Sequence, residues 1–516
     1  MNTLAVGYAI VATFFFLMIA KYDIHMFQLS SYRNRRYFRW LIPGNIISLK
    51  RTFALILFAA AFIPEYWATG IAALITVIGY IHCFREKFKT PLVYTMRVKR
   101  LFLTDILLFV AIALSALFFA TEWAKAITGA TLLLSNFLML IANIVNKPIE
   151  KAINRYYYND AKRIIESNKN LIIIGVTGSF GKTSTKNYLA TVLAEKYNVL
   201  VTPGNFNTLL GVIRTIREQL RPYHQVFIVE MGAKQKNDIK EICDLVHPTI
   251  GIVTAVGEMH LETFKSIENI QDTKFELINS LPTNGLGIIN NDSIYINNYK
   301  GITSQCNIIR YAVENDADYK ATEVHYGANG VSFKLNGDEQ FNSRLLGVGN
   351  LLNILASIAV ANHLQVPINK QKNAIARLQP VEHRLSMKVA NGITVLDDAY
   401  NSNPQGAKMA LEVLKNFTVG EENKRIVITP GFVEMGTRQA VANKELGVTI
   451  AKSCDYAIVV NTTNREAIKL GIDEGGLATD RYYLADSLNQ AHAHLAQILK
   501  AGDVVLYEND LPDNFK

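Results

Sequence analysis

The hydrophobic pattern of the chain changes near residue 170. Before that point the apolar residues form long runs, at 4–20, 53–63, 68–84, 101–120 and 126–145. An apolar helix of about 20 residues is long enough to cross a bilayer. We therefore predict a transmembrane segment of about five runs within residues 1–150. The short 53–63 run leaves open a re-entrant hairpin formed with 68–84.

Basic residues gather in two of the loops between these runs. Residues 1–150 contain 15 Lys and Arg against 6 Asp and Glu, and most of the basic ones lie in 21–51 and 85–100. Because positively charged loops stay on the cytoplasmic side, we predict that the N-terminus is outside and that everything after Lys147 is cytoplasmic. The first run has no basic start and no small-residue cleavage site, so we interpret it as an anchor rather than a signal peptide. The expected location is the cell membrane, with several passes.

Charge and cysteine usage exclude other classes. Residues 151–516 contain 38 residues of each sign, so the surplus of +9 belongs to the apolar part and does not indicate nucleic acid. The four cysteines lie far apart, which gives neither a disulfide framework nor a zinc site and suits a reducing compartment. Asp105 is the one acidic residue within the apolar runs. We interpret it as a helix end near the interface; a polar partner for a lipid headgroup or a neighbouring helix is the alternative.

After residue 170, short apolar runs alternate with helical stretches. The runs lie at 171–176, 198–202, 226–231 and 249–254, and the helical stretches at 182–196, 235–245 and 267–280. This alternation predicts an α/β fold with a mostly parallel sheet covered on both faces. A strand-rich patch at 285–347 and a helix at 350–364 follow. A second alternating block has strands near 392–397, 425–429, 456–460 and 503–507. We therefore expect three domains, at 1–150, 151–380 and 381–516, with 147–170 as a linker helix.

The first of these runs leads into a glycine-rich turn. Residues 171–174 predict a buried strand, Thr-Gly-Ser-Phe-Gly-Lys-Thr follows at 177–183, and a helix begins at Lys182. Amide groups at such a helix start attract phosphate. Lys182 could then neutralise the β- and γ-phosphates, and the Thr183 hydroxyl could bind Mg²⁺. An ordinary tight turn is the alternative, and Val176 stands where the full P-loop pattern has glycine; Gly-Lys-Thr at the helix start favours nucleotide binding.

Three candidates outside the loop are weak when taken alone. Glu230 ends a strand, where ligands of open α/β sheets gather, and could hold Mg²⁺. His260 follows the next strand end, and a lone histidine is usually a structural hydrogen-bonding group. Lys274, taken alone, is a surface lysine on a helix.

Seven further motifs follow the loop in a definite order. They are Gly-Asn-Phe-Asn at 204–207, Glu-Met-Gly-Ala at 230–233, His-Leu-Glu at 260–262, Lys-Phe-Glu at 274–276, Gly-Asn-Leu-Leu-Asn at 349–353, Glu-His-Arg at 382–384 and Asp-Asp-Ala-Tyr-Asn-Ser-Asn-Pro at 397–404. Their order over about 171–470 resembles that of the Mur ligase family. The last motif is similar to the signature of the F member, which joins D-alanyl-D-alanine to a UDP-N-acetylmuramoyl-tripeptide. The resemblance implies a P-loop central domain and a Rossmann-like C-terminal domain.

The resemblance also implies a role for each matching residue. The implied ATP-binding residues are Thr177, Gly178, Ser179, Gly181, Lys182, Thr183, Ser184, Asn350 (adenine), Arg384 (phosphates) and Asp398 (ribose). The implied ligands of two Mg²⁺ ions are Thr183, Glu230, His260 and a carbamylated Lys274. Carbamylation would turn the ammonium group into an anionic oxygen ligand, which suits Mg²⁺. The implied catalytic residues are Lys182, His260, Lys274 and Arg384, and the implied substrate residues are Asn205, Asn207, Tyr400, Asn401 and Asn403.

The sequence departs from the family pattern in several places. Gly349 replaces a histidine, and the run 507–512 stands where the F member has Lys-Gly-Ser-Arg. The membrane segment occupies the place of the small domain that grips the UDP-sugar.

We therefore predict a membrane-anchored, ATP-dependent amide-bond ligase that adds an amino acid or dipeptide to a cell-wall peptide precursor through an acyl phosphate. The expected partners are ATP, Mg²⁺, the membrane and a carboxylate acceptor that is UDP-linked or lipid-linked. A polyglutamate-type synthase and a P-loop membrane ATPase without ligase chemistry are the alternatives.

Overall fold

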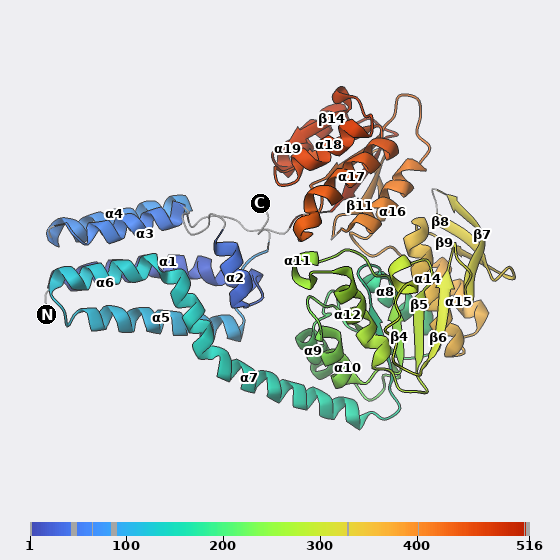
Figure 1. Cartoon of the computed structure of the whole chain (residues 1–516), viewed down its shortest axis with the longest axis horizontal. Helices are drawn as coiled ribbons and strands as arrows, with labels where there is room; N and C mark the ends of the chain where they lie inside the picture. Colours follow the sequence, from blue (N-terminus) through green and yellow to red (C-terminus); the bar gives the residue numbers. More distant parts are fainter. Residues whose placement is uncertain are drawn as a thin grey trace. The chain divides into compact units, whose positions relative to one another are not determined.

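The structure is a computed structural model that describes residues 3–42, 49–63, 65–83, 90–327, 330–400, 402–509 and 511. The chain forms two compact units, residues 1–156 and 157–511. Each unit is described separately (Figure 1).

The first unit is entirely helical over its described residues. Its helices are α1 (Thr3–Leu29), α2 (Asn34–Leu41), α3 (Leu49–Ala60), α4 (Glu65–Cys83), α5 (Met96–Ala116), α6 (Thr121–Leu133) and the first part of α7 (Ser135–Ser167). Aromatic side chains fill the core between α1 and α5, where the rings of Phe16 and Phe109 stack with centroids 4.1 Å apart. The predicted 147–170 linker is therefore the second half of a longer helix, which continues through Pro148.

The predicted set of about five membrane-crossing runs is not supported. Among the described residues one helix, Val6–Leu29, is long and apolar enough to cross a membrane, or two if the bent pair α6–α7 counts as one span. The predicted 101–120 run corresponds to α5, which carries Arg97, Lys99, Arg100 and Asp105 and ends at Ala116. The predicted 126–145 run is broken between α6 and α7 by a bend of 75°. The charged residues of α5 and the bend between α6 and α7 explain why these two predicted runs do not qualify as membrane spans.

The outer surface of this unit is nevertheless apolar. Of the 38 large hydrophobic side chains that are exposed among the described residues, 28 lie before residue 157. They include Phe14 on α1, Trp67 on α4 and Phe118 after α5. A helical unit that is apolar both inside and outside has a surface suited to a partner or a membrane.

A buried ion pair joins three helices of the same unit. Arg51 donates to both carboxylate oxygens of Asp23, at 2.6 and 2.7 Å, and Ser135 donates to Asp23 Oδ2 at 3.1 Å. Asp105 is fully buried in the interior of α5, and neither of its carboxylate oxygens has a hydrogen-bond partner among the described residues. Its interpretation as a helix end is therefore wrong.

The second unit contains a nine-stranded sheet in the order β2-β3-β1-β4-β5-β6-β7-β8-β9. Its strands are β1 (Ile172–Thr177), β2 (Val199–Val201), β3 (Val226–Glu230), β4 (Ile250–Val253), β5 (Leu286–Asn290), β6 (Asn307–Ala312), β7 (Tyr319–Gly327), β8 (Gly330–Leu335) and β9 (Glu339–Ser343). Strands β1 to β6 are parallel, and β7 to β9 form an antiparallel extension. The predicted parallel sheet and strand-rich patch are confirmed.

Helices cover both faces of this sheet (Figure 1). They are α8 (Lys182–Leu193), α14 (Gly347–His363) and α15 (Ile368–Ala376) on one face, and α9 (Leu209–Gln219), α10 (Asp238–Val246) and α12 (Ile267–Asn279) on the other; α11 (Leu261–Phe264) and α13 (Ile294–Asn297) are short. The neighbours Ile173 and Ile174 of β1 belong to opposite cores, which is why the strand is apolar throughout. Helix α9 was not predicted, although its apolar residues Leu209, Val212, Ile213 and Ile216 recur at helical spacing.

A six-stranded sheet follows in the same unit, in the order β10-β11-β15-β12-β13-β14. Its strands are β10 (Ser386–Ala390), β11 (Ile393–Asp398), β12 (Arg425–Thr429), β13 (Tyr456–Val460), β14 (Tyr482–Ala485) and β15 (Val504–Glu508), and its helices are α16 (Pro404–Lys415), α17 (Gln439–Ser453), α18 (Arg465–Glu474) and α19 (Leu488–Ile498), with short 3₁₀ turns at Gly436–Arg438 and Thr479–Arg481. All strand pairs are parallel except β10–β11. The four predicted strands are confirmed, while β10 and β14 were not predicted.

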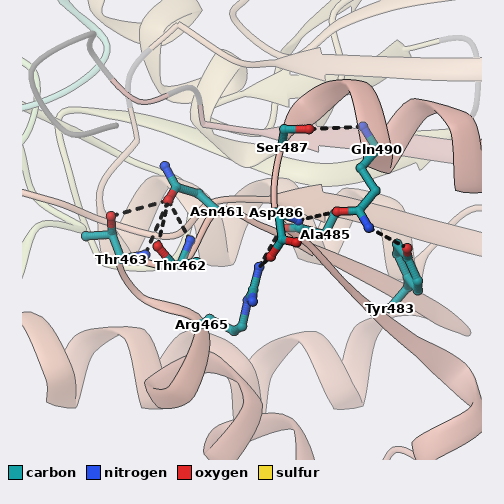
Figure 2. Close-up of polar contacts among 9 residues, drawn as sticks. All are labelled: Asn461, Thr462, Thr463, Arg465, Tyr483, Ala485, Asp486, Ser487 and Gln490. Atoms are coloured by element: carbon teal, nitrogen blue, oxygen red, sulfur yellow. Dashed lines mark hydrogen bonds and ion pairs between the residues drawn. The ribbon is translucent and has the colours of Figure 1, made fainter. Parts of the chain in front are cut away.

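Figure 2 shows the polar contacts among the residues that follow β13 and β14. Arg465 donates to the carboxylate of Asp486 at 2.7 Å and to the carbonyl of Ala485 at 2.9 Å. Gln490 accepts from the amide of Asp486 and donates to the hydroxyl of Tyr483. These contacts tie the loop after β14 to α18 and α19.

The buried ion pair yields a stability prediction. Asp23→Ala leaves the Arg51 guanidinium buried without a carboxylate, and we expect a loss of about 3–5 kcal/mol in the unfolding free energy of the helical unit. The double variant Asp23→Leu/Arg51→Met removes both charges and should lose much less. All three tryptophans, Trp40, Trp67 and Trp123, lie in this unit, so tryptophan fluorescence during denaturation reports on it alone. Equal stability of Asp23→Ala and the wild type would contradict the prediction.

Candidate active site

The glycine loop between β1 and α8 can only be built with glycine at two positions. Gly178 and Gly181 have φ of 154° and 81°. A Cβ atom on Gly178 would lie 2.1 Å from Thr254 Oγ1, and one on Gly181 would lie 2.7 Å from Asn353 Oδ1. Because Gly181 directly precedes the first residue of α8, the loop leads into the amide groups of a helix N-terminus, which favours an anion.

The segment after β4 holds this loop in shape. The Ser179 amide donates to the Ala255 carbonyl at 2.7 Å, and the Ser179 hydroxyl accepts from the Gly257 amide at 3.0 Å. Thr254 Oγ1 donates to the carbonyl of Phe180. The Thr177 hydroxyl donates to the Met231 carbonyl at 2.8 Å. The predicted ATP-binding residues Thr177 and Ser179 thus use their side chains to fix the loop.

Lys182 lies folded over the loop that it follows. Its Nζ donates to the Gly178 carbonyl at 2.7 Å and to the Ser179 carbonyl at 3.1 Å. Burial lowers the pKa of Lys182 to about 8, and the positive charge of Arg384 acts in the same direction, whereas Glu230 opposes it. Thr183 and Ser184 lie in the same first turn of α8. The ammonium group is therefore poorly solvated where an anion would stabilise it.

A second lysine of α8, Lys186, was not predicted as a site residue. It is buried and donates to the Thr202 carbonyl at 2.8 Å and to the Gly204 carbonyl at 2.7 Å. It also forms an ion pair with Glu230 Oε2 at 3.2 Å. Residues four apart lie on the same face of a helix, so the spacing of Lys182 and Lys186 was a usable signal. Lys186 connects the carboxylate at the end of β3 to the loop after β2.

Lys274 is buried in the same region, so its interpretation as a surface lysine is wrong. It lies on α12 with 4% of its surface exposed. Burial, and then the charge of Lys182, lower the pKa of Lys274 to about 7. Three basic side chains interact with the buried carboxylate of Glu230, namely Lys182, Lys186 and Arg384, and Lys274 lies near Lys182. Such an excess of positive charge suits a polyphosphate.

His260, the remaining predicted metal ligand, is engaged elsewhere. It precedes α11 with φ of 55°, and its Nδ1 is in contact with Glu434 Oε2. The Glu262 amide donates to the Glu434 carbonyl at 3.1 Å. No group of three His, Cys, Asp or Glu side chains in the described part of the chain is placed to hold a metal ion. The structure thus brings Glu230 and Lys274 close to the phosphate loop and gives His260 a different partner.

A cleft lies over the loop and is lined by residues of both sheets. Its lining includes Gly181, Ser184, Asn350 and Asn353 from the nine-stranded part, and Arg384, Asp398, Ser402 and Asn403 from the six-stranded part. The Tyr188 hydroxyl donates to Asn350 Oδ1 at 2.9 Å, which fixes the amide at the wall of the cleft. The cleft therefore brings together the predicted ATP-binding residues Asn350, Arg384 and Asp398. Asn353 and Ser402 also line it; both lie within the motifs, but neither was predicted as a site residue.

Two charged groups define the far wall of the cleft. Arg384 stacks on the ring of Tyr400, with its guanidinium carbon 4.2 Å from the ring centre. Asp398 Oδ1 accepts from the Leu385 amide at 3.0 Å. Burial raises the pKa of Asp398 to about 6, although Arg384 and the Leu385 amide favour its charged form. This wall can accept hydrogen bonds from hydroxyl groups and bind an anion beside them.

The predicted substrate residues are only partly brought together. Asn205 donates to the Tyr400 hydroxyl at 2.9 Å, which links the two sheets. Asn207 donates to Glu230 Oε1 at 3.0 Å. Asn403 caps α16 by accepting from the Gly406 amide at 3.0 Å. Asn401 lies outside the described residues.

Comparison with known proteins agrees with this architecture. The Mur ligase middle domain matches residues 176–361, and the Mur ligase glutamate ligase domain matches residues 383–507. The chain is similar to UDP-N-acetylmuramoyl-tripeptide--D-alanyl-D-alanine ligases. It is 29% identical to that of Bacillus subtilis over 54% of this chain and 60% of the relative, and 30% identical to that of Synechocystis over 65% of this chain and 71% of the relative. The chain thus spans only about 60% of the length of the Bacillus relative.

Solved structures show the same fold. The Thermotoga maritima MurF ligase in complex with ADP superposes with a TM-score of 0.60 at 26% identity, covering 69% of this chain and 80% of that one. MurF from Acinetobacter baumannii gives a TM-score of 0.62 at 22% identity, covering 69% and 77% of the two chains. Together with the two matched domains and the Synechocystis relative, these likenesses show that the chain belongs to the Mur ligase family.

Proposed function

We propose that this chain is an ATP-dependent ligase that joins a carboxylate to an amine. The observation that carries the proposal is the arrangement of Lys182, Lys186 and Arg384 around Glu230, with Lys274 near Lys182, beside a glycine loop. This cluster provides the charge that a triphosphate requires. The names of the similar ligases and the ADP bound to the Thermotoga relative support the same assignment.

The nucleotide would extend from the loop into the cleft. The amides at the start of α8 would bind the phosphates, and Lys182 would exchange its two carbonyl partners for phosphate oxygens. Asn350 would lie at the adenine side, and Asp398 would accept from the ribose hydroxyls. Arg384 would reach the phosphates from the opposite wall. Binding therefore requires both sheets to face the same cleft.

The residues present fit a magnesium ion. Glu230 Oε2 accepts no hydrogen bond among the described residues and forms an ion pair with Lys186, while Thr183 lies in the first turn of α8. Glu230 and Thr183 would hold the ion with phosphate oxygens. When bound, the ion would neutralise charge on the transferring phosphoryl group. The role of His260 as a ligand of a second ion would require it to leave Glu434.

The reaction itself follows from these positions. The substrate carboxylate attacks the γ-phosphorus, the bond to ADP breaks, and an acyl phosphate forms. The amine then attacks the acyl carbon, phosphate leaves and the amine loses a proton. Lys182 and Arg384 stabilise the charge that develops on the transferring group. By analogy with the named relatives, we propose a peptide carboxylate of the muramoyl-tripeptide type and an amine of the D-alanyl-D-alanine type.

We further propose that the helical unit attaches this ligase to a membrane and that its carboxylate substrate is lipid-linked. The apolar outer surface of that unit and the candidate span Val6–Leu29 support the attachment. The basic residues of 21–51 and 85–100 could hold a phosphate-bearing headgroup at the membrane surface.

Lys182→Ala should lower the rate of ATP-dependent product formation by about 100-fold or more, because it removes the charge that neutralises the moving phosphoryl group. The measurement is phosphate release with substrates at saturation. Lys196→Ala is a matched control, since Lys196 is exposed and donates to the Leu364 carbonyl away from the cleft. A near-normal rate in Lys182→Ala would refute the assignment of the loop.

Lys274→Ala should also lose activity, and acetate at high concentration should restore part of it. An amine with a pKa of about 7 is about half uncharged at neutral pH, and the uncharged form can react with carbon dioxide. The group missing from the variant is then an anionic oxygen, which a small acid imitates. Lys236→Ala, which removes an exposed lysine, is the control. A wild-type rate in Lys274→Ala would exclude a role in the reaction.

The substrate proposal is tested by comparing the full-length protein in detergent with a truncated protein that begins at Asn159. Each is given lipid-linked and UDP-linked peptide acceptors. We expect the full-length protein to prefer the lipid-linked acceptor by tenfold or more in kcat/KM, and the truncated protein to lose that preference. If the truncated protein uses the UDP-linked acceptor as well as the full-length protein uses either one, the helical unit serves only for attachment.

A further inference from the structure

Glu508, the last residue of β15, and Asn509, which follows it, form hydrogen bonds with the segment after β11. The Ser402 hydroxyl donates to Glu508 Oε1, and the Ser402 amide donates to Asn509 Oδ1 at 3.2 Å. Asn509 also donates through its side chain to the Gly431 carbonyl, after β12, and through its amide to the Asp398 carbonyl at 3.3 Å. Three strand ends are therefore connected through Glu508 and Asn509, next to the cleft that Asp398 and Ser402 line.

Glu508 and Asp398 are also neighbours across the sheet. They are partners in the parallel pairing of β15 with β11, so their side chains leave the same face, about 5 Å apart at the backbone. Glu508 is fully buried, and its Oε2 has no hydrogen-bond partner among the described residues. Two carboxylates this close in a buried place do not both ionise readily. Burial, and then the charge of Asp398, raise the pKa of Glu508.

We propose that Glu508 and Asn509 position the nucleotide-binding wall of the cleft, and that Glu508 does so as a neutral acid while Asp398 keeps the negative charge. A neutral Glu508 holds Ser402 without repelling Asp398, whose charged oxygens remain available for the hydroxyl groups of the nucleotide. This proposal rests on the proposed function, since it assumes that the nucleotide occupies this cleft. It concerns the run at 507–512, where the sequence departs from the F member.

Other ionisable groups lie around Glu508 and Asp398. Apart from Arg384, each of them has another partner, is exposed, or lies on the other face of the sheet. Arg384 faces Asp398 from the segment before β10, and His383 is hydrogen-bonded to Asp397 at 2.8 Å. Tyr507 precedes Glu508 and is partly buried on the other face of the sheet. The ionisable side chains of α16, which packs on the same face as Glu508, are exposed: Lys408, Glu412 and Lys415. On α17, Lys444 pairs with Glu474 and Glu445 with Arg438, while Lys452 is exposed.

The alternative is that replacing any buried carboxylate of this sheet weakens ATP binding by disturbing the fold. A second buried carboxylate beside the same strand provides a control for that alternative. Asp503 immediately precedes β15, at the edge of the sheet opposite the cleft, and is buried. Its Oδ1 accepts from the Lys424 amide and its Oδ2 from the Lys500 amide, both at 2.8 Å. Asp503→Asn therefore perturbs a hydrogen-bonded carboxylate of the same strand without touching the nucleotide wall.

The experiment measures the equilibrium Kd for ATP, and the KM for ATP and kcat, of the full-length protein. Glu508→Ala should raise Kd and KM at least tenfold with little change in kcat, because the wall is displaced while the phosphate loop is intact. Asn509→Ala should raise Kd three- to fivefold. Glu508→Gln, which imitates the neutral acid, should stay within threefold of the wild type at pH 7. Asp503→Asn should bind ATP as the wild type does.

The pH dependence tests the proton on Glu508. Above neutral pH Glu508 of the wild type loses its proton, so two negative charges face each other and ATP affinity falls. Glu508→Gln has no such proton to lose. The ratio of wild-type Kd to Glu508→Gln Kd should therefore rise at least threefold between pH 7 and pH 9.5, and taking the ratio cancels the titration of Lys182, which both proteins share.

Each outcome decides between the proposals. Wild-type Kd in Glu508→Ala and Asn509→Ala overturns the positioning role. A Kd in Glu508→Gln as weak as in Glu508→Ala, or a ratio that does not change with pH, overturns the neutral acid. Failure of the wild-type protein itself to bind ATP overturns the proposed function instead. If Glu508→Ala does not fold, the other two variants still decide.

Discussion

The site depends on one buried ion pair, that between Lys186 and Glu230. A lysine in the protein interior is costly unless its charge and all its donors are satisfied. Lys186 meets this condition with two carbonyl groups of the loop after β2 and the carboxylate that ends β3. The same bonds fix α8, and with it the glycine loop, against the carboxyl edge of the sheet. The position of the phosphate-binding amides therefore follows from a buried charge.

Around this pair the protein collects more positive than negative charge. Lys274 is buried and Lys182 is half-buried, and each has a pKa below that of a free lysine because little water reaches it. Positive charges this close repel one another, and Lys182 offsets part of that repulsion by donating to loop carbonyls. A polyphosphate would offset it more completely, because it brings negative charge to the same place.

The opposite wall follows a different principle. There Asp398 and Glu508 are adjacent, and Arg384 offsets the charge of Asp398. Parallel pairing places both carboxyl groups at the carboxyl edge of the six-stranded sheet, where ligands of α/β sheets gather. One side of the cleft is therefore basic, and the other offers oxygen atoms that can accept hydrogen bonds. The helical unit adds a third environment, with an apolar surface and a core that contains the Asp23–Arg51 pair.

The sequence by itself determined the local chemistry and the architecture of the second unit. The apolar strand at 171–176, the glycine turn and Lys182 at the helix start are adjacent in the chain, so local spacing was sufficient to predict them. The parallel strands of both sheets followed from runs that are apolar on both faces. The short strands β10 and β14 were not predicted because short, half-polar segments have weak periodicity, whereas helix α9 carried a usable apolar pattern.

Only the tertiary structure decided which distant residues meet. It buried Lys274, which looks like a surface residue in the sequence, and gave Lys186 a role through bonds to residues 16 to 44 positions away. It also turned His260 toward Glu434, 174 residues later, and placed Glu508 beside Asp398. The length of an apolar run predicted membrane spans, but the breaks and charges of the folded helices left one clear candidate. Burial and pairing across the chain are properties of the packed fold, and no local pattern encodes them.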